Sequence, residues 1–189
     1  MHFEEKSAVH EALRKITRRL AELGVPYAVV GGMALFRHGL RRFTEDVDIL
    51  VTREGLAVIH EELDGRGYVP PFTDSKNLRD AELGVRIEFL ISGQYPGDGK
   101  EKPVAFPDPR DVSVDLEGTS FIRLADLVNL KLASGMTSPG RLKDLADVQE
   151  LIKRLHLTEE FGQQLNPYVR DKFEVLRQAA ELGDAEENA

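Results

Sequence analysis

Apolar residues recur along the chain with two different periods. A helical period covers residues 4–23, and Gly24 with Pro26 ends that helix. Short runs rich in valine and isoleucine, which are typical of buried strands, alternate with further helical segments after it. The predicted strands cover residues 27–30, 44–51 and 85–91. The predicted helices after the first cover residues 33–36, 55–66, 124–135, 141–156 and 158–182, the last broken at Pro167.

This order indicates an α+β protein in which a small mixed sheet is flanked by helices and followed by a C-terminal helical region. The sheet-bearing core is expected over residues 1–123 and the helical region over residues 124–182. Residues 68–83 contain two consecutive prolines and several turn formers, so they are expected to be irregular, with one strand near their end. The acidic tail, residues 183–189, is expected to be disordered.

The predicted strand over residues 44–51 carries polar residues at alternate positions. Because side chains alternate along a strand, Thr44, Asp46, Asp48 and Leu50 share one face. Val47, Ile49 and Val51 share the other face and point to the core. The two carboxylates lie about 6–7 Å apart at the backbone, which lets both reach one hard cation. A solvent-facing strand edge with two acids is the alternative interpretation.

A third carboxylate, Glu88, stands in the middle of the apolar strand predicted over residues 85–91. Arg86 and Glu88 share one face of that strand, and the other face is wholly apolar. A carboxylate in so apolar a segment needs a physical reason. One reason is a salt bridge to Arg86, and the other is a metal site completed from a neighbouring strand.

Gly31-Gly32 connects the first predicted strand to the helical stretch over residues 33–36. A strand that enters a helix through two glycines exposes backbone N–H groups at the helix N-terminus, where the helix dipole also favours a phosphate. Plain turns contain the same pair, so the glycines indicate a phosphate site only in combination with other residues.

That combination is present in the order Gly31-Gly32, a thirteen-residue spacer, Asp46-Val47-Asp48 and the strand-borne Glu88. It resembles the signature of the nucleotidyltransferase superfamily related to DNA polymerase beta. The segment GGMALFRHGLRRFTEDVDILV resembles the small bacterial members in particular: the AbiEii-type toxins, the minimal nucleotidyltransferases, and the aminoglycoside and lincosamide nucleotidyltransferases. The resemblance covers residues 27–92 and implies the nucleotidyltransferase fold.

The resemblance also implies a chemistry. A nucleoside monophosphate would move from a nucleoside triphosphate to an acceptor hydroxyl with the help of two Mg²⁺ ions, and Asp46, Asp48 and Glu88 would be the catalytic, metal-binding residues. The nucleotide-binding residues that it implies are Gly31, Gly32, Arg42, Thr44, Lys131 and Asp147.

Two of these residues belong to the predicted C-terminal helices. By the same resemblance Lys131 would approach the triphosphate, and Asp147 or Asp144 would orient the triphosphate or the acceptor. The structural alternatives are a Lys131 side chain that extends to solvent and an Asp144 that pairs with Lys143 or Arg141 near a helix N-terminus.

Composition and charge limit the kinds of partner and the cellular location expected for this protein. Apolar residues make up 41% of the chain, no stretch approaches the run of about 18 that a membrane helix needs, and the N-terminus lacks the order of a signal peptide. A cytoplasmic protein with no membrane partner is therefore expected. The absence of cysteine excludes disulfides and thiolate metal sites. The net charge is −8, half of it in the last nine residues, so strong general nucleic-acid binding is not expected.

Three classes of function follow. The first is a nucleotidyltransferase acting on a protein, an RNA end or a small molecule, with the toxin of a toxin–antitoxin pair, and hence an antitoxin partner, as one form of it. The second is a nucleotide-binding module with the fold but without turnover. The third is a partner-binding protein that uses its helical C-terminus. Walker A, zincin and nucleophile-elbow motifs are absent from the sequence.

Overall fold

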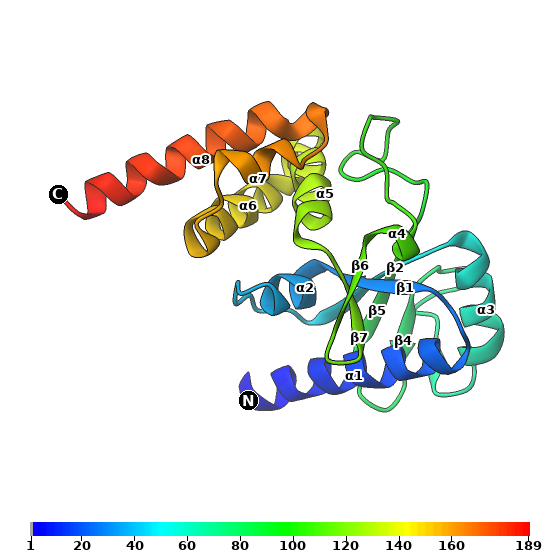
Figure 1. Ribbon diagram of the computed structural model, residues 1–189. Helices are drawn as coiled ribbons and strands as arrows, with labels where there is room; N and C mark the ends of the chain where they lie inside the picture. Colours follow the sequence, from blue (N-terminus) through cyan, green and yellow to red (C-terminus); the bar gives the residue numbers. More distant parts are fainter. Residues whose placement is uncertain (1) are drawn as a thin grey trace. The chain divides into compact units, whose positions relative to one another are not determined.

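The computed structural model describes residues 2–189, with side chains from residue 8 onward (Figure 1). The chain divides into two compact units, a sheet unit and a helical unit. The sheet unit comprises the residues up to Arg37, Arg41–Gly93 and Pro107–Ile122. The helical unit comprises His38–Leu40, Gln94–Phe106 and Arg123–Ala189, so it takes in a loop that the sequence division at residue 123 leaves in the core.

A seven-stranded mixed sheet forms the first unit, with the strand order β3-β4-β5-β2-β1-β7-β6. β2 runs antiparallel to β1 and parallel to β5, and β7 runs parallel to β1. The predicted class, a mixed sheet flanked by helices, is confirmed. The strands are β1 (Tyr27–Val30), β2 (Asp46–Val51), β3 (Tyr68–Val69), β4 (Leu78–Asp80), β5 (Arg86–Ile91), β6 (Ser113–Leu116) and β7 (Thr119–Ile122).

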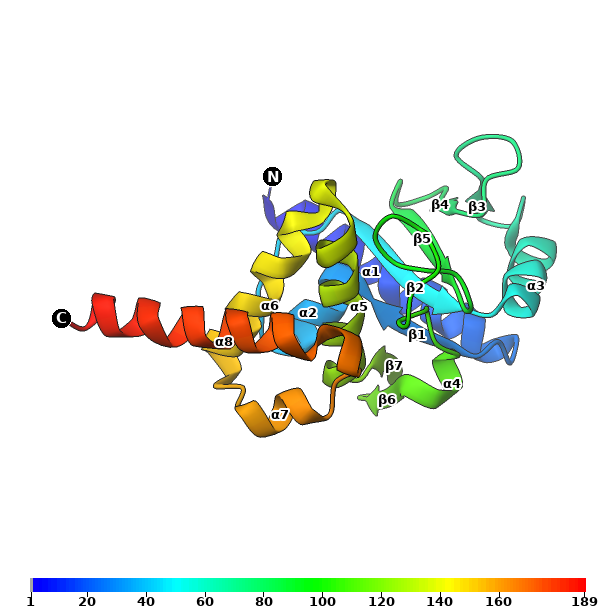
Figure 2. The same ribbon diagram turned by 90° about the horizontal axis from the view of Figure 1, so that it is seen from above.

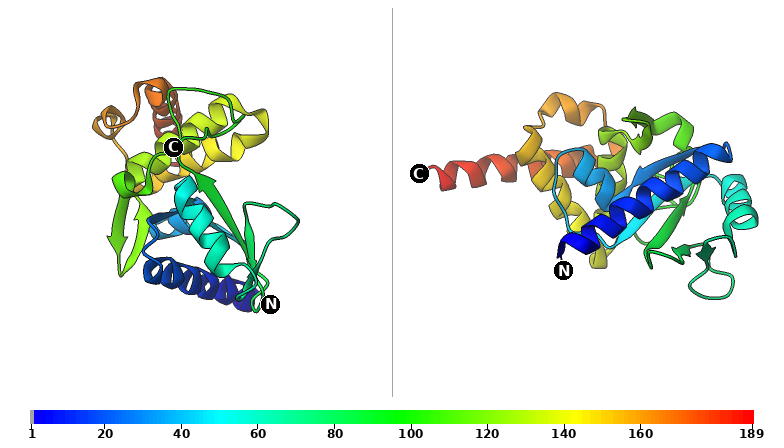
Figure 3. Two further views of the ribbon diagram at one scale, coloured as in Figure 1. Left: turned by 90° about the vertical axis from the view of Figure 1, so that its right-hand side faces the viewer. Right: turned by 90° about the horizontal axis from the view of Figure 1, so that it is seen from below.

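Four helices belong to the sheet unit: α1 (His2–Glu22), α2 (Gly31–Arg37), α3 (Arg53–Leu63) and α4 (Pro109–Val112). α1 crosses one face of the sheet, as the right view of Figure 3 shows, and buries its apolar stripe completely at Ile16 and Leu20. α3 begins at a capped end, where the Thr52 side chain accepts a hydrogen bond from the Gly55 N–H at 3.0 Å.

The core of this unit rests on side-chain alternation, which holds along all of β5 and from Asp46 to Ile49 in β2, whose last residues are all buried. Val47 and Ile49 on β2, like Ile87 and Phe89 on β5, have no exposed surface. On the opposite face, Asp46, Asp48 and Glu88 are half-buried. Alternation of this kind fixes which residues of each strand face the helices and which remain for a site.

The hairpin of β6 and β7 lies outside the strands that sequence patterning predicts. Polar residues interrupt its hydrophobic pattern, so only its turn is marked in the sequence. There Glu117 (φ +56°) and Gly118 (φ +85°) both adopt positive φ, which suits a two-residue hairpin.

The helical unit packs its long helices against one another (Figure 2). α8 begins at Pro167 after an Asn166 cap, as the proline predicts. It continues through Glu187, so residues 183–187 of the tail expected to be disordered are helical: Ala185, Glu186 and Glu187 are good helix formers and extend an already formed helix. The elements are α5 (Leu124–Thr137), the 3₁₀ turn η1 (Pro139–Arg141), α6 (Leu142–Leu155), α7 (Glu159–Gln163) and α8 (Pro167–Glu187). No helix within residues 2–189 has the length and apolarity to cross a membrane.

Candidate functional site

The three acids singled out by the sequence lie together on one face of the central strands. β2 and β5 pair in parallel with Asp48 aligned to Glu88 and Asp46 aligned to Arg86. Residues aligned on neighbouring strands share a sheet face, so Asp46, Asp48 and Glu88 project on the same side. Each is half-buried, which leaves the carboxylates shielded yet accessible.

Repulsion among these acids is visible in their electrostatics. Burial raises the pKa of Asp46 above its ordinary value, the charge of Glu88 raises it further, and the charges of Arg86 and Arg79 oppose the rise. Glu88 forms an ion pair with Arg86, whose Nη2 lies 3.1 Å from the Glu88 Oε1. The salt bridge expected as one reason for Glu88 is therefore present, and Asp46 remains destabilised in its charged form.

Gly31 must be glycine for two separate reasons. Its φ of +65° lies in the left-handed region, which side chains disfavour. A Cβ built on it would also overlap the Asp48 carboxylate, so the backbone and that side chain are in contact. The sequence predicts a turn ahead of the helix, whereas α2 starts at Gly31 itself, directly after β1.

Gly32 and Thr44 pack against each other beside the acids. A Cβ on Gly32 would lie 2.9 Å from the Thr44 Cβ, closer than real Cβ contacts allow. The Thr44 hydroxyl donates a hydrogen bond of 3.0 Å to the backbone carbonyl of Asp46. Thr44 thus fixes the start of β2, and with it the backbone that carries Asp46. Arg42 lies half-buried in the preceding loop of the same unit.

The donor set suits a hard divalent cation that arrives with a phosphate ligand. Among the described residues, no three His, Asp or Glu side chains converge closely enough to form a ready-made metal cage, and Glu88 is turned to Arg86. Mg²⁺ does not need such a cage, because it usually takes one or two carboxylates together with substrate phosphates and water. Asp46 and Asp48, on one strand face beside the bare Gly31 backbone, fit that mode.

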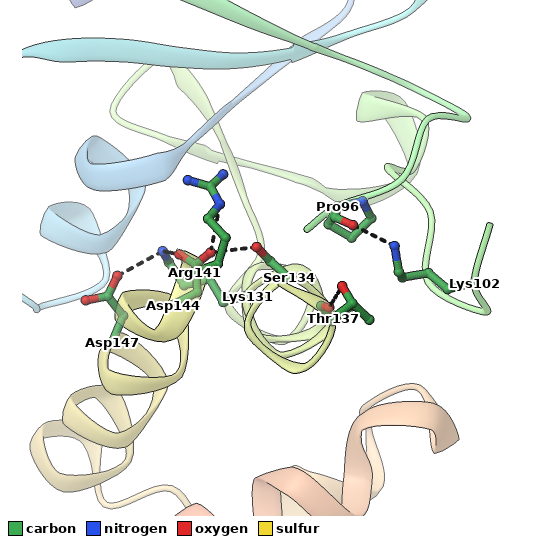
Figure 4. A network of polar contacts seen from close by, with 9 residues as sticks. Pro96, Lys102, Lys131, Ser134, Thr137, Arg141, Asp144 and Asp147 are labelled. Atoms are coloured by element: carbon green, nitrogen blue, oxygen red, sulfur yellow. Dashed lines mark hydrogen bonds and ion pairs between the residues drawn. The ribbon is translucent and has the colours of Figure 1, made fainter. Parts of the chain in front are cut away.

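Lys131 and Asp147 meet in a separate network inside the helical unit (Figure 4). Lys131 Nζ on α5 donates to Asp144 Oδ1 and to Asp147 Oδ2 on α6, each at 3.0 Å. The Ser134 hydroxyl adds a bond of 2.7 Å to the other Asp144 oxygen. The Asp147 side chain is only 2% exposed and that of Lys131 12%, so Lys131 does not extend to solvent.

Searches against protein-family models and curated protein sequences find no match. Solved structures do match over nearly the whole chain. A protein of H. pylori assigned as a nucleotidyltransferase aligns with a TM-score of 0.50 at 17% identity, over 95% of this chain and 96% of that one. The antibiotic-resistance factor ANT(2″)-Ia aligns in its solution structure with a TM-score of 0.57 at 14% identity, over 100% and 97%. The chain has the nucleotidyltransferase fold.

A second structure of ANT(2″)-Ia, solved in complex with adenylyl-2″-tobramycin, aligns with a TM-score of 0.53 at 13% identity, over 90% of this chain and 95% of that one. The fold implied by the sequence resemblance is thereby confirmed, and its AbiEii-type detail stays a prediction. Within the nucleotidyltransferase fold, the structure brings Gly31, Gly32 and Thr44 to the three acids of the sheet unit. It brings Lys131 to Asp147 in the helical unit.

One member of the acidic sheet face cannot be found from the sequence pattern. Arg79 on β4 is aligned with Arg86 on β5, so it joins the same face. β4 lies in the segment expected to be mostly irregular, and three residues are too few to show a period. The only signal in the sequence is the short run Asn77-Leu78-Arg79-Asp80 between turn formers.

Proposed function

We propose that this protein is a Mg²⁺-dependent nucleotidyltransferase that moves a nucleoside monophosphate from a nucleoside triphosphate to an acceptor hydroxyl. One observation carries the proposal: Asp48 is aligned with Glu88 across adjacent strands and touches the bare backbone of Gly31. Carboxylates for a metal and a glycine backbone for a phosphate therefore meet at one point of a nucleotidyltransferase fold.

The reaction is a single in-line displacement. The acceptor oxygen attacks the α-phosphorus, an O–P bond forms, and the bond from the α-phosphorus to the bridging oxygen breaks. Pyrophosphate leaves with that electron pair, and the hydroxyl proton passes to a carboxylate or to water. Bound Mg²⁺ ions would stabilise the charge that develops on the attacking and leaving oxygens.

The protein's own groups hold the reactants in this scheme. Asp46 and Asp48 hold the metals, and Glu88, once released from Arg86, helps to take the acceptor proton. The Gly31-Gly32 backbone receives the triphosphate, because the glycines place no side chain of their own beside the N–H groups at the start of α2. Arg42 contacts the triphosphate and Thr44 keeps Asp46 in position. Lys131 and Asp147 stay predictions from the resemblance, as nucleotide-binding residues.

A thermal-stability assay tests the nucleotide part of the proposal. The protein is heated with each of the four nucleoside triphosphates, with and without Mg²⁺, and a rise in the melting temperature with at least one pair is expected. Binding at 100 times Kd adds about 2.7 kcal/mol to the native state, which is readily measured. No shift with any triphosphate would contradict both the enzyme and a simple nucleotide-binding module.

Turnover is tested separately with α-labelled triphosphates and total cell RNA or lysate. Label should appear in a product with the wild type and be absent with Asp48→Ala. Equal labelling by Asp48→Ala would contradict the metal assignment, and triphosphate binding without any labelled product would favour the binding module. A labelled protein or RNA that stops growth when the enzyme is expressed would favour the toxin, with an antitoxin as its partner.

A further inference from the structure

Two arginines stand side by side next to the three acids, and they are directly opposite each other on antiparallel strands. Arg79 on β4 is aligned with Arg86 on β5, and Arg86 is in turn aligned with Asp46 on β2. Like charges directly opposite each other on neighbouring strands destabilise a sheet. The repulsion between the two arginines must therefore be offset by negative charge. Within the part of the chain that the structure describes, a carboxylate offsets the charge of Arg86 but not that of Arg79.

Arg86 is balanced by its ion pair with Glu88 at 3.1 Å. Arg79 is not: among the described residues no carboxylate lies within ion-pair distance of its guanidinium, and its one hydrogen bond goes to the Gly84 carbonyl at 3.0 Å. Arg79 is exposed, and a guanidinium group has five N–H donors, of which this bond uses one. Its field still reaches the acids, because it lowers the pKa of Asp46.

The order of the strands places this arginine pair on the side of the three acids that lies away from Gly31. Across β1, β2 and β5, Val30 is aligned with Asp48 and Asp48 with Glu88, and Gly31 follows Val30 directly. The proposed triphosphate contact is thus at the β1 edge of the acids, and the arginines lie beyond them at the β5 and β4 edge. Neighbouring strands are about 4.8 Å apart, so Arg79 stands about 10 Å from β2 at the backbone. The nucleophile of an in-line displacement enters opposite the leaving pyrophosphate, hence from the arginine side.

We propose that Arg79 and Arg86 bind a phosphate group of the acceptor, so that the acceptor is a phosphate-bearing molecule with a free hydroxyl. The proposal rests on the nucleotidyltransferase function above and narrows its acceptor class. Paired guanidinium groups match phosphate oxygens in charge and geometry. Two sources supply this chemistry: the 3′-terminal nucleotide of an RNA strand and a phosphorylated small molecule. A neutral or cationic acceptor would gain nothing from Arg79.

The test uses the full chain and two probes: a fluorescent single-stranded oligoribonucleotide with a free 3′-OH, and ribose 5-phosphate. Arg79→Gln is the test variant, because glutamine keeps a polar side chain with N–H donors but carries no charge. Arg79→Lys keeps the charge. Arg66→Gln is the matched control, since Arg66 is an exposed arginine of the same unit whose ion pair is with Glu62. Arg86 is left unchanged because it also holds Glu88.

Anisotropy titrations over a range of salt concentrations should show binding of the oligoribonucleotide to the wild type and to Arg66→Gln. Arg79→Gln should bind about 10-fold more weakly, with the slope of log K against log salt reduced by about 0.7, and Arg79→Lys should bind within about 3-fold of wild type. If only ribose 5-phosphate raises the melting temperature, and only when residue 79 is charged, the acceptor is a phosphorylated small molecule.

Two results would overturn the acceptor proposal: neither probe binds to the wild type, or the wild type and Arg79→Gln bind both probes equally well. The triphosphate–Mg²⁺ shift in melting temperature, measured on the same samples, reports separately on the proposed function. It should be equal in Arg79→Gln and wild type. If triphosphate and Mg²⁺ do not raise the melting temperature of the wild type, the nucleotidyltransferase proposal itself is contradicted. The two failures are therefore distinguishable.

Discussion

Both units of the protein gather carboxylates, but the two groups differ in burial and in charge balance. In the helical unit Lys131 lies between Asp144 and Asp147, at 3.0 Å from each, and all three side chains are at least four-fifths buried. In the sheet unit the Glu88 side chain is 33% exposed, and the pKa of Asp46 is raised by burial and by Glu88.

The difference indicates what each group is built to do. A buried acid with an internal cation contributes to stability as long as both partners remain, since removing one leaves a charge uncompensated. Half-buried acids that repel each other cost stability, and an external divalent cation relieves that cost. Substitutions in the helical network should therefore lower stability first, and substitutions among the sheet acids should lower activity first.

The largest effect is expected for Asp48→Asn, which keeps the shape of the side chain and removes its charge. Nucleotidyl transfer should fall about 10³-fold or more, because several kcal/mol of metal-dependent charge stabilisation are lost. The melting temperature without metal should stay near wild type. Pyrophosphate release and Mn²⁺ binding followed by magnetic resonance measure the two losses. Asp111→Asn, an exposed acid of the same unit, is the control; equal Mn²⁺ binding by both variants would break the comparison.

Lys131→Met reverses the pattern. It leaves Asp144 and Asp147 without their shared cation and should lower the free energy of unfolding by about 3–5 kcal/mol, measured by urea denaturation. Arg123→Met removes an ion pair of similar length, 3.0 Å to Asp126, but Arg123 is 55% exposed. That control should cost about 1 kcal/mol or less. Similar losses for the two variants would show that the Lys131 network is not a buried one.

Gly31→Ala and Gly24→Ala separate backbone strain from contact with the site. The two glycines have nearly the same φ, +65° and +66°, yet a Cβ on Gly24 would meet no atom within 4 Å, whereas one on Gly31 would overlap Asp48. Each substitution should cost about 1–2 kcal/mol for the left-handed backbone. Only Gly31→Ala should also displace Asp48 and remove the triphosphate–Mg²⁺ shift in melting temperature. Loss of that shift in both variants would assign it to backbone strain.

The sheet acids could be predicted from the sequence because polar and apolar residues alternate over residues 46–49 of β2 and 86–89 of β5. The parity of Asp46, Asp48 and Glu88 along such strands determines which face each of them occupies. The alignment of Asp48 with Glu88 could not be predicted, because strand pairing depends on contacts between residues 40 positions apart. The position of Arg79 could not be predicted for the same reason, because β4 is defined by its pairing with β5 and not by a hydrophobic pattern of its own.

In the helical network, the burial of the residues could be predicted from the sequence but not all of their charge partners could. Lys131 and Asp147 were singled out by resemblance, and the sequence offered Arg141 or Lys143 as partners for Asp144. The structure confirms an ion pair between Arg141 and Asp144, at 3.6 Å, and adds Lys131, which lies between the two aspartates at 3.0 Å from each. Helical periodicity tells which residues are buried, but not which helix supplies the partner of a buried charge. That choice follows from how α5 and α6 pack.

Asp46→Asn should have the smallest effect of these substitutions, and it should raise the stability of the metal-free protein. The ordinary pKa of an aspartate is 3.8, and burial with the nearby Glu88 raises that of Asp46 in the folded protein. Between the two values the native state holds a proton that the unfolded state has lost, so stability falls as pH rises through this window. Above the folded-state pKa the loss is complete, and the uncharged asparagine should then raise the melting temperature by about 1–3 °C.

The gain from Asp46→Asn should disappear below pH about 3.8, where the wild-type carboxyl is protonated in both states. It should also disappear, or change sign, when Mg²⁺ and the preferred triphosphate are added at neutral pH, because the wild type then gains a cation that the variant cannot hold. Scanning calorimetry over a pH series, with and without the ligands, measures both dependences against Asp111→Asn. A variant less stable than wild type at neutral pH without metal would show that the Asp46 charge already has a stabilising partner, and the contrast with the Lys131 network would be lost.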